Sequence, residues 1–243
     1  MGCRSHGNRN VQNNPPVKKI AAYGVHLFTA SGAALALWAL VLIFEESYQM
    51  ALWALAGTVL IDSVDGALAR LVQTKKHAAA IDGALLDNIV DYLTWTAIPL
   101  FWIYATMHLP LWVLLVCAAA SALGFSNTEA KTSDHFFLGF PSYWNIVVVY
   151  IFLLQLSVFW ATLIMLAFAV ATFLPVKYVY PTRTLFLRKT TLLLGSFFVI
   201  HFLALIYFYD RASPLLLYSS LLFPCYYFGL SFYLNVKTAE TSS

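Results

Sequence analysis

The chain has 243 residues, of which 61% are hydrophobic and only 10% are charged, and its formal net charge is +3. Soluble domains usually carry about 25% charged residues, and a chain of this size cannot bury so much apolar surface in one core. The composition excludes a soluble enzyme, a disordered chain and a nucleic-acid-binding protein, and it predicts an integral membrane protein.

The first element is an N-terminal arm over residues 1–16. It is polar, shows no hydrophobic periodicity and closes with Pro15-Pro16. Nothing in it offers enough apolar burial to offset the entropy of ordering the backbone, so we expect a flexible arm. Residues 17–243 are expected to form a single polytopic membrane domain.

Eight apolar stretches follow, most of them close to the roughly 20 residues that a helix needs to cross a bilayer core of about 30 Å. They lie at 22–44, 48–72, 83–107, 110–126, 144–156, 158–176, 190–209 and 214–236. The fifth and sixth stretches meet at a tight turn over 155–157, and joining them would leave seven spans. The pattern indicates an all-α integral membrane protein with about eight transmembrane helices.

The basic residues decide between eight and seven spans, because cytoplasmic loops are enriched in Lys and Arg. With eight spans and a cytoplasmic N-terminus, only Arg211 lies on the far side. The cytoplasmic side then holds Arg4, Arg9, Lys18, Lys19, Arg70, Lys75, Lys76, Lys131, Lys177, Arg183, Arg188, Lys189 and Lys237. Seven spans would move Lys177, Arg183, Arg188, Lys189 and Lys237 to the far side and leave a much weaker bias. We therefore expect eight spans with both termini in the cytoplasm.

An acidic cluster occupies the second and third stretches. Asp62 and Asp65 lie in LIDSVDGALARLV, whereas Asp87 and Asp91 lie in DGALLDNIVDYLTW. A carboxylate inside a span costs about 2.5–3.5 kcal/mol on insertion scales, so intramembrane acids indicate a functional site. Asp82 is expected to cap the N-terminus of the third helix instead.

Helical spacing places these acids on two facing surfaces. Asp62 and Asp65 are three residues apart, and Gly83, Asp87 and Asp91 follow one another at intervals of four. Four carboxylates on antiparallel helices supply hard oxygen ligands for one or two Mg²⁺ or Mn²⁺ ions, which suits phosphoryl transfer. The alternative is that the acids simply pair with neighbouring basic residues at a polar helix end.

The pattern Asp62-x-x-Asp65-Gly66-x-x-Ala69-Arg70, followed by Gly83-x-x-x-Asp87-x-x-x-Asp91, resembles the signature of the CDP-alcohol phosphotransferases. All eight fixed positions match. Most members place eight residues between the Arg and the second Gly, whereas this chain has twelve, as in the bacterial phosphatidylcholine synthases. The segments 25–32, 131–145 and 173–183 also look like that branch, although His26 stands where most relatives have Asn.

The resemblance implies a membrane transferase that moves a phosphatidyl group from CDP-diacylglycerol to choline and releases CMP. It implies that Asp62, Asp65, Asp87 and Asp91 bind Mn²⁺ or Mg²⁺, as one or two ions, and that Asp91 is the general base. The implied nucleotide and diphosphate contacts are Thr29, Asp62, Gly66, Ala69, Arg70 and Gly83. The resemblance also implies a homodimer in contact with membrane lipids. It implies a location in the bacterial inner membrane, with the active site at the cytoplasmic face.

Choline carries a quaternary ammonium without N–H donors, so aromatic faces are expected to recognise it. Our candidates near the cytoplasmic end are Tyr143, Trp144, Asn145 and Tyr178. Two alternatives stay open. A related transferase would use serine, inositol or glycerol phosphate as the acceptor, and a cation transporter would use the same carboxylates without CMP chemistry.

Overall fold

The structure is a computed structural model and describes residues 16–130, 132, 136–181 and 184–241. The expected N-terminal arm lies outside the described residues except for Pro16. Lys131 and Arg183, two of the basic residues assigned to the cytoplasmic side, lie outside them as well.

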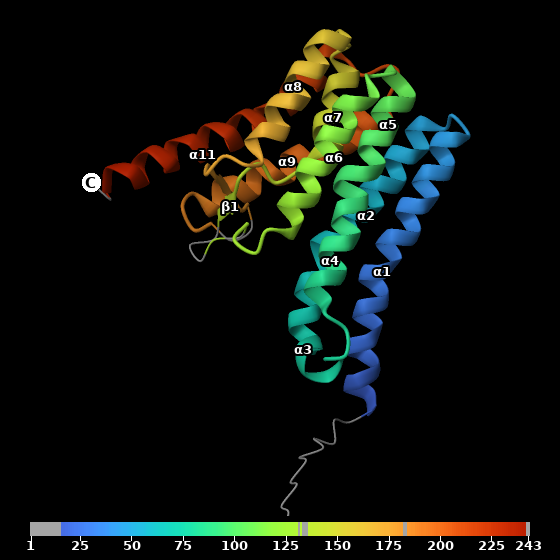
Figure 1. Ribbon diagram of the computed structural model, residues 1–243, viewed down its shortest axis with the longest axis vertical. Coiled ribbons are helices and arrows are strands. Elements are labelled where there is room, and N and C mark those ends of the chain that lie inside the picture. Colours follow the sequence, from blue (N-terminus) through green and yellow to red (C-terminus); the bar gives the residue numbers. More distant parts are fainter. Residues whose placement is uncertain (1–15, 131, 133–135, 182–183, 242–243) are drawn as a thin grey trace, which may run out of the picture.

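The described chain is mainly helical (Figure 1). Its helices are α1 (Pro16–Phe44), α2 (Tyr48–Val72), α3 (Thr74–His77), α4 (Gly83–Asp91), the π-helix η1 (Tyr92–Ala97), α5 (Ile98–Met107), α6 (Leu111–Ser126), α7 (Trp144–Leu153), α8 (Val158–Ala171), α9 (Arg188–Tyr207), α10 (Pro214–Ser220) and α11 (Leu222–Thr241). Each of the eight apolar stretches is thus largely covered by one helix or by a run of adjoining helices. The fifth and sixth stretches form separate helices, because α7 ends at Leu153 and α8 begins only at Val158.

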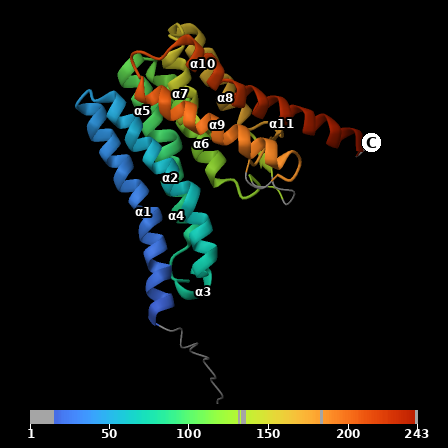
Figure 2. The same cartoon turned by 180° about the vertical axis from the view of Figure 1, so that it is seen from behind.

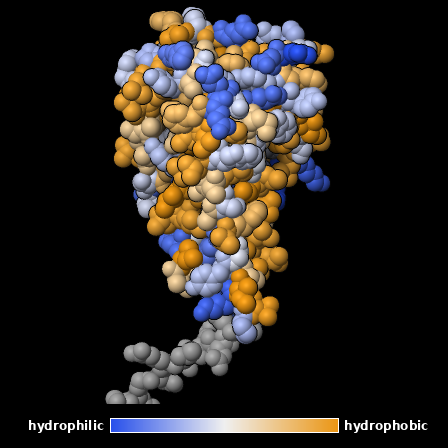
Figure 3. Space-filling model, turned by 90° about the vertical axis from the view of Figure 1, so that its right-hand side faces the viewer, coloured by the Kyte–Doolittle hydropathy of each residue, from blue (hydrophilic) through white to orange (hydrophobic). Residues whose placement is uncertain are grey.

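The molecule has the apolar surface of a membrane protein. Among the described residues, four helical segments are long and apolar enough to cross a membrane: Pro16–Phe44, Tyr48–Val72, Arg188–Tyr207 and Pro214–Lys237. Shorter apolar helices are α6, α7 and α8. On the face drawn in Figure 3, apolar side chains predominate through the middle, and hydrophilic groups gather toward the two ends.

Two short strands interrupt the helical fold, which the sequence patterns did not predict. β1 (Phe136–Leu138) pairs antiparallel with β2 (Lys177–Val179), and Phe137 lies opposite Tyr178. The two strands precede α7 and follow α8, respectively, so they tie the connections at the same end of these two helices together.

The first helix holds the two acid-bearing helices together. α1 packs along α2 and also contacts α4, and both contacts depend on small residues. A Cβ atom on Gly32 would lie 2.8 Å from Val90 of α4, and one on Gly57 would lie 2.8 Å from Leu35 of α1. Figure 2 shows α1, α2 and α4 side by side, with α11 extending away from them toward the C-terminus. This close packing places the middle of α2 near α4.

Candidate metal and aromatic site

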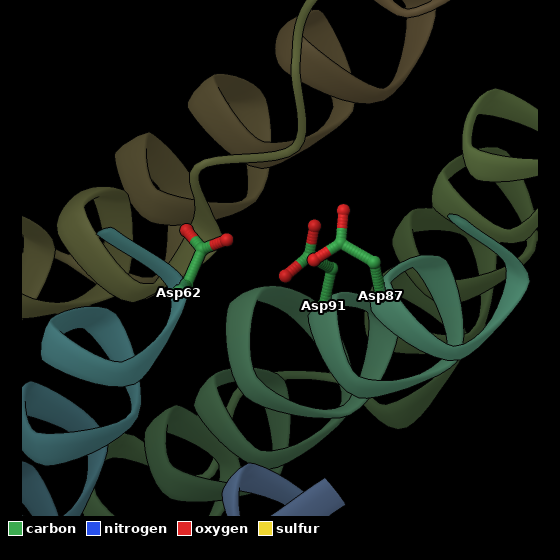
Figure 4. Close-up of side chains that lie close together, drawn as sticks. All are labelled: Asp62, Asp87 and Asp91. Atoms are coloured by element: carbon green, nitrogen blue, oxygen red, sulfur yellow. The ribbon is translucent and has the colours of Figure 1, made fainter. Parts of the chain in front are cut away.

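Three of the four expected carboxylates converge in the structure. Asp62 projects from α2 toward Asp87 and Asp91 of α4 (Figure 4). Each residue offers a carboxylate oxygen, these oxygens all lie within 4.8 Å of one another, and all three side chains are partly exposed. We call these three residues the acidic triad. The four-residue spacing on α4 brings Asp87 and Asp91 to one face of that helix.

The fourth carboxylate, Asp65, has a different environment. Its side chain is buried, and its Oδ2 atom accepts a hydrogen bond of 2.8 Å from the Oγ1 hydroxyl of Thr29 on α1. Residues three apart on a helix differ in direction by about 60°. Asp62 therefore faces α4 while Asp65 faces α1, and Asp65 does not belong to the acidic triad.

The acidic triad fits a small divalent cation. Mg²⁺ binds oxygen at about 2.0–2.1 Å, so two ligand atoms on opposite sides of one ion lie about 4 Å apart. The oxygens of the triad come close to this arrangement. Carboxylates this close together repel one another, and a cation bound between them would relieve that repulsion. Asp62, Asp87 and Asp91 are therefore the residues that would hold the metal.

The residues expected to contact the nucleotide lie around the same two helices. A Cβ atom on Gly83 would come within 2.9 Å of the buried His26 ring, so glycine permits α1 and α4 to approach here. The Nε2 atom of this ring has no hydrogen-bond partner. On α2, Gly66 and Ala69 are partly exposed and Arg70 is exposed. Directly before α4, Asp82 accepts hydrogen bonds from the Ala84 and Leu85 amides, which confirms the predicted N-cap.

The four residues expected to bind choline differ in accessibility. Tyr143, which precedes α7, is partly exposed. Trp144 is fully buried, and its indole N–H donates to Ser121. Tyr178 is 4% exposed and stacks on Tyr227. Asn145 is also buried, and its Oδ1 atom has no hydrogen-bond partner.

The structure adds an aromatic residue that the sequence analysis missed. Trp95 of η1 lies against Tyr143, with ring centroids 5.2 Å apart. It extends the series Gly83, Asp87 and Asp91 by another four residues, and this spacing was the signal that would have found it.

Tyr143 also lies within electrostatic reach of the acidic triad. Burial raises the pKa of the Tyr143 phenol, and among nearby groups the charges of Asp62 and Asp91 raise it further. Two carboxylates of the acidic triad thus lie close enough to this ring to act on it electrostatically.

A family model described as CDP-alcohol phosphatidyltransferase matches residues 26–175. The chain belongs to this family. The family is generally dependent on divalent metals, so the acidic triad is a candidate metal-binding site. The matched region contains the whole acidic cluster, His26 and the Trp95–Tyr143 pair.

Three relatives show how far the similarity extends. The chain is 42% identical to the phosphatidylcholine synthase of Legionella pneumophila over 224 residues, and this aligned region covers 88% of each chain. It is 38% identical to that of Legionella bozemanae, over 83% of this chain and 98% of the relative. It is 35% identical to the phosphatidylcholine synthase of Borreliella burgdorferi, over 72% of this chain and 77% of the relative. The similarity therefore continues well beyond the residues of the family model.

Proposed function

We propose that the protein is a phosphatidylcholine synthase that uses CDP-diacylglycerol and choline and releases CMP. The observation that carries this proposal is the similarity over most of the chain to relatives named phosphatidylcholine synthase. The acidic triad supports it, because transfer of a phosphatidyl group from a diphosphate requires stabilisation of negative charge.

In the proposed reaction, the choline hydroxyl oxygen forms a bond to the phosphorus that carries diacylglycerol. The bond from this phosphorus to the bridging diphosphate oxygen breaks, and CMP leaves with the electron pair. Asp91 takes the proton from the hydroxyl. A divalent ion bound by Asp62, Asp87 and Asp91 would supply positive charge to the diphosphate.

Other residues of α1, α2 and α4 position these groups in our proposal. The hydrogen bond from Thr29 fixes the Asp65 carboxylate against α1, next to the acidic triad. Asp65 then either binds a second metal ion or helps to position the ligands of the first ion. We assign the nucleotide and its phosphates to Thr29, Asp62, Gly66, Ala69, Arg70 and Gly83. Arg70, exposed on the last turn of α2, supplies charge to the diphosphate.

The proposed arrangement in the membrane is eight spans over a single catalytic domain, residues 17–243, with both termini in the cytoplasm. The distribution of basic residues supports it, as does the separation of α7 from α8. The acyl chains of the donor would remain in lipid while its nucleotide reaches the acidic triad from the cytoplasmic face. We further propose the bacterial inner membrane as the location, and a homodimer.

The test uses the purified full-length protein in detergent with CDP-diacylglycerol and Mn²⁺ or Mg²⁺. Addition of choline should release CMP and form phosphatidylcholine in equal amounts, and a chelator should abolish both. Asp91→Asn should lower kcat by about 10²–10⁴-fold, because the base is lost together with one charged ligand of the metal. Release of CMP with serine, inositol or glycerol phosphate, but not with choline, would overturn the proposed acceptor.

A further inference from the structure

Four partly exposed rings lie together beside the acidic triad, and they come from three separate parts of the chain. They are Trp95 of η1, Phe137 of β1, Tyr143 at the start of α7, and Tyr180 just after β2. The centroid distances are 5.2 Å for Trp95–Tyr143, 6.5 Å for Phe137–Tyr143 and 4.5 Å for the stacked Phe137–Tyr180 pair. We call them the ring cluster.

Exposure separates the ring cluster from the aromatic residues behind it. Trp144 and Tyr178 are 0% and 4% exposed, and both pack edge-on against the Phe140 ring. The indole N–H of Trp144 is already bonded to Ser121. These buried rings have no free face for a ligand, whereas the members of the ring cluster keep part of their surface accessible.

The ring cluster lies at a suitable distance from the acidic triad. Trp95 follows Asp91 by four residues, which is about one helical turn further along the chain, on the π-helix that begins at Tyr92. Choline has only two carbon atoms between its hydroxyl oxygen and its nitrogen. A hydroxyl held at Asp91 would therefore bring the ammonium group to the neighbouring turn, where Trp95 lies.

The charges around the ring cluster also favour a cation. Burial is the main cause of the raised pKa of the Tyr143 phenol, and Asp62 and Asp91 are among the charged groups close enough to raise it further. Lys177, the cation of β2, belongs to the other face of the strand, and its Nζ atom lies 5.7 Å from the Phe136 ring centroid. Negative charge is thus near the accessible rings, and this lysine is directed away from them.

We propose that the ring cluster binds the trimethylammonium group of choline, with Trp95 and Tyr143 as the main contacts. This inference rests on the proposed function. A quaternary ammonium has no hydrogen to donate, so ring faces and nearby carboxylates are the groups that stabilise it, and Trp is the most favourable ring. In this assignment Trp144 and Tyr178 support the cluster from behind.

The test compares Trp95→Leu with the wild-type protein in detergent, with saturating CDP-diacylglycerol and varied choline. The expected result is a KM for choline raised about 5- to 30-fold, with kcat and the KM for CDP-diacylglycerol changed less than twofold. Trp95→Phe should recover most of the loss because it restores a ring face. Trp53→Leu is the matched control, since Trp53 is a partly buried tryptophan of α2 away from the site.

A neutral acceptor of the same shape, 3,3-dimethyl-1-butanol, separates charge recognition from structural damage. The wild-type protein should prefer choline to this alcohol, and Trp95→Leu should reduce that preference. If Trp95→Leu does not fold, Tyr143→Leu on a different element provides the same comparison. An unchanged choline KM, or an equal loss with both acceptors, would overturn the ring-cluster assignment. A wild-type protein that does not use choline would instead refute the proposed function.

Discussion

Two acids of the same helix have different neighbours. Asp62 contributes to the acidic triad, whereas Asp65 is buried and accepts a hydrogen bond from Thr29 on α1. A buried carboxylate that loses its donor keeps the cost of leaving water. The Thr29 hydroxyl is therefore expected to contribute to stability as well as to the site.

We expect Thr29→Val to lower the free energy of unfolding by about 1–3 kcal/mol, because valine keeps the shape but removes the donor to Asp65. Thr29→Ser is the control, since serine retains the hydroxyl. The measurement is denaturant or thermal unfolding in detergent. Equal stability of the valine and serine variants would show that the hydrogen bond contributes nothing.

A second prediction for a single residue concerns Gly83. In Gly83→Ala the new Cβ would approach the His26 ring within 2.9 Å, so we expect a loss of about 1–3 kcal/mol in unfolding free energy. Adding His26→Ala removes the ring and should restore part of that loss, which a double-mutant cycle measures. Gly24→Ala is the control, because nothing lies within 4 Å of its Cβ position. Strict additivity of Gly83→Ala and His26→Ala would exclude the steric explanation.

Spacing along one helix predicted more of the site than aromatic content did. The i, i+4 interval of Asp87 and Asp91 holds because both lie on α4, and the same interval reaches Trp95. By contrast, Trp144 and Tyr143 are adjacent in sequence, yet only Tyr143 is accessible. Which of two adjacent rings faces a site depends on contacts with distant helices, and hydropathy does not contain that information.

At the scale of elements, hydropathy located the helices but not their irregular parts. The π-helix η1 and the pairing of β1 with β2 were not predicted. Each strand has three residues, and some 40 positions separate them, so no local periodicity marks them. Such features form because tertiary packing outweighs local preference.

The start of α7 is joined to α6 through one serine, and the position of Tyr143 depends on this junction. Ser121 Oγ accepts hydrogen bonds from the Trp144 indole N–H at 2.7 Å and from the Ser142 hydroxyl at 2.9 Å. All three residues are buried. Tyr143 lies between Ser142 and Trp144, so the same bonds fix the backbone that carries this ring.

We expect Ser121→Ala to lower the unfolding free energy by about 2–4 kcal/mol, because two buried donors lose their acceptor. The control is Ser126→Ala on the same helix, where an exposed hydroxyl bonds only within its own helix, and it should change stability by less than about 0.5 kcal/mol. Both variants are compared by thermal unfolding in one detergent. Similar melting temperatures for the two would contradict this account of the junction.

At the scale of the whole molecule, the placement of the acidic triad depends on the number of spans. Thr190 at the start of α9 distinguishes the two topologies, because it is cytoplasmic with eight spans and external with seven. Glu46, between α1 and α2, is external in both. Both residues are exposed, so a cysteine at either position is accessible to a reagent that reaches its side of the membrane.

We therefore expect opposite labelling of two single-cysteine variants, made in a chain whose Cys3, Cys117 and Cys225 are replaced. In spheroplasts, a maleimide that does not cross the membrane should label Glu46→Cys and should label Thr190→Cys only after the cells are opened. The physical reason is the charge count, because eight spans keep 13 of 14 basic residues on the cytoplasmic side. Labelling of Thr190→Cys in intact spheroplasts would favour seven spans. It would also separate the basic residues after α8 from the cytoplasmic face on which we place the reaction.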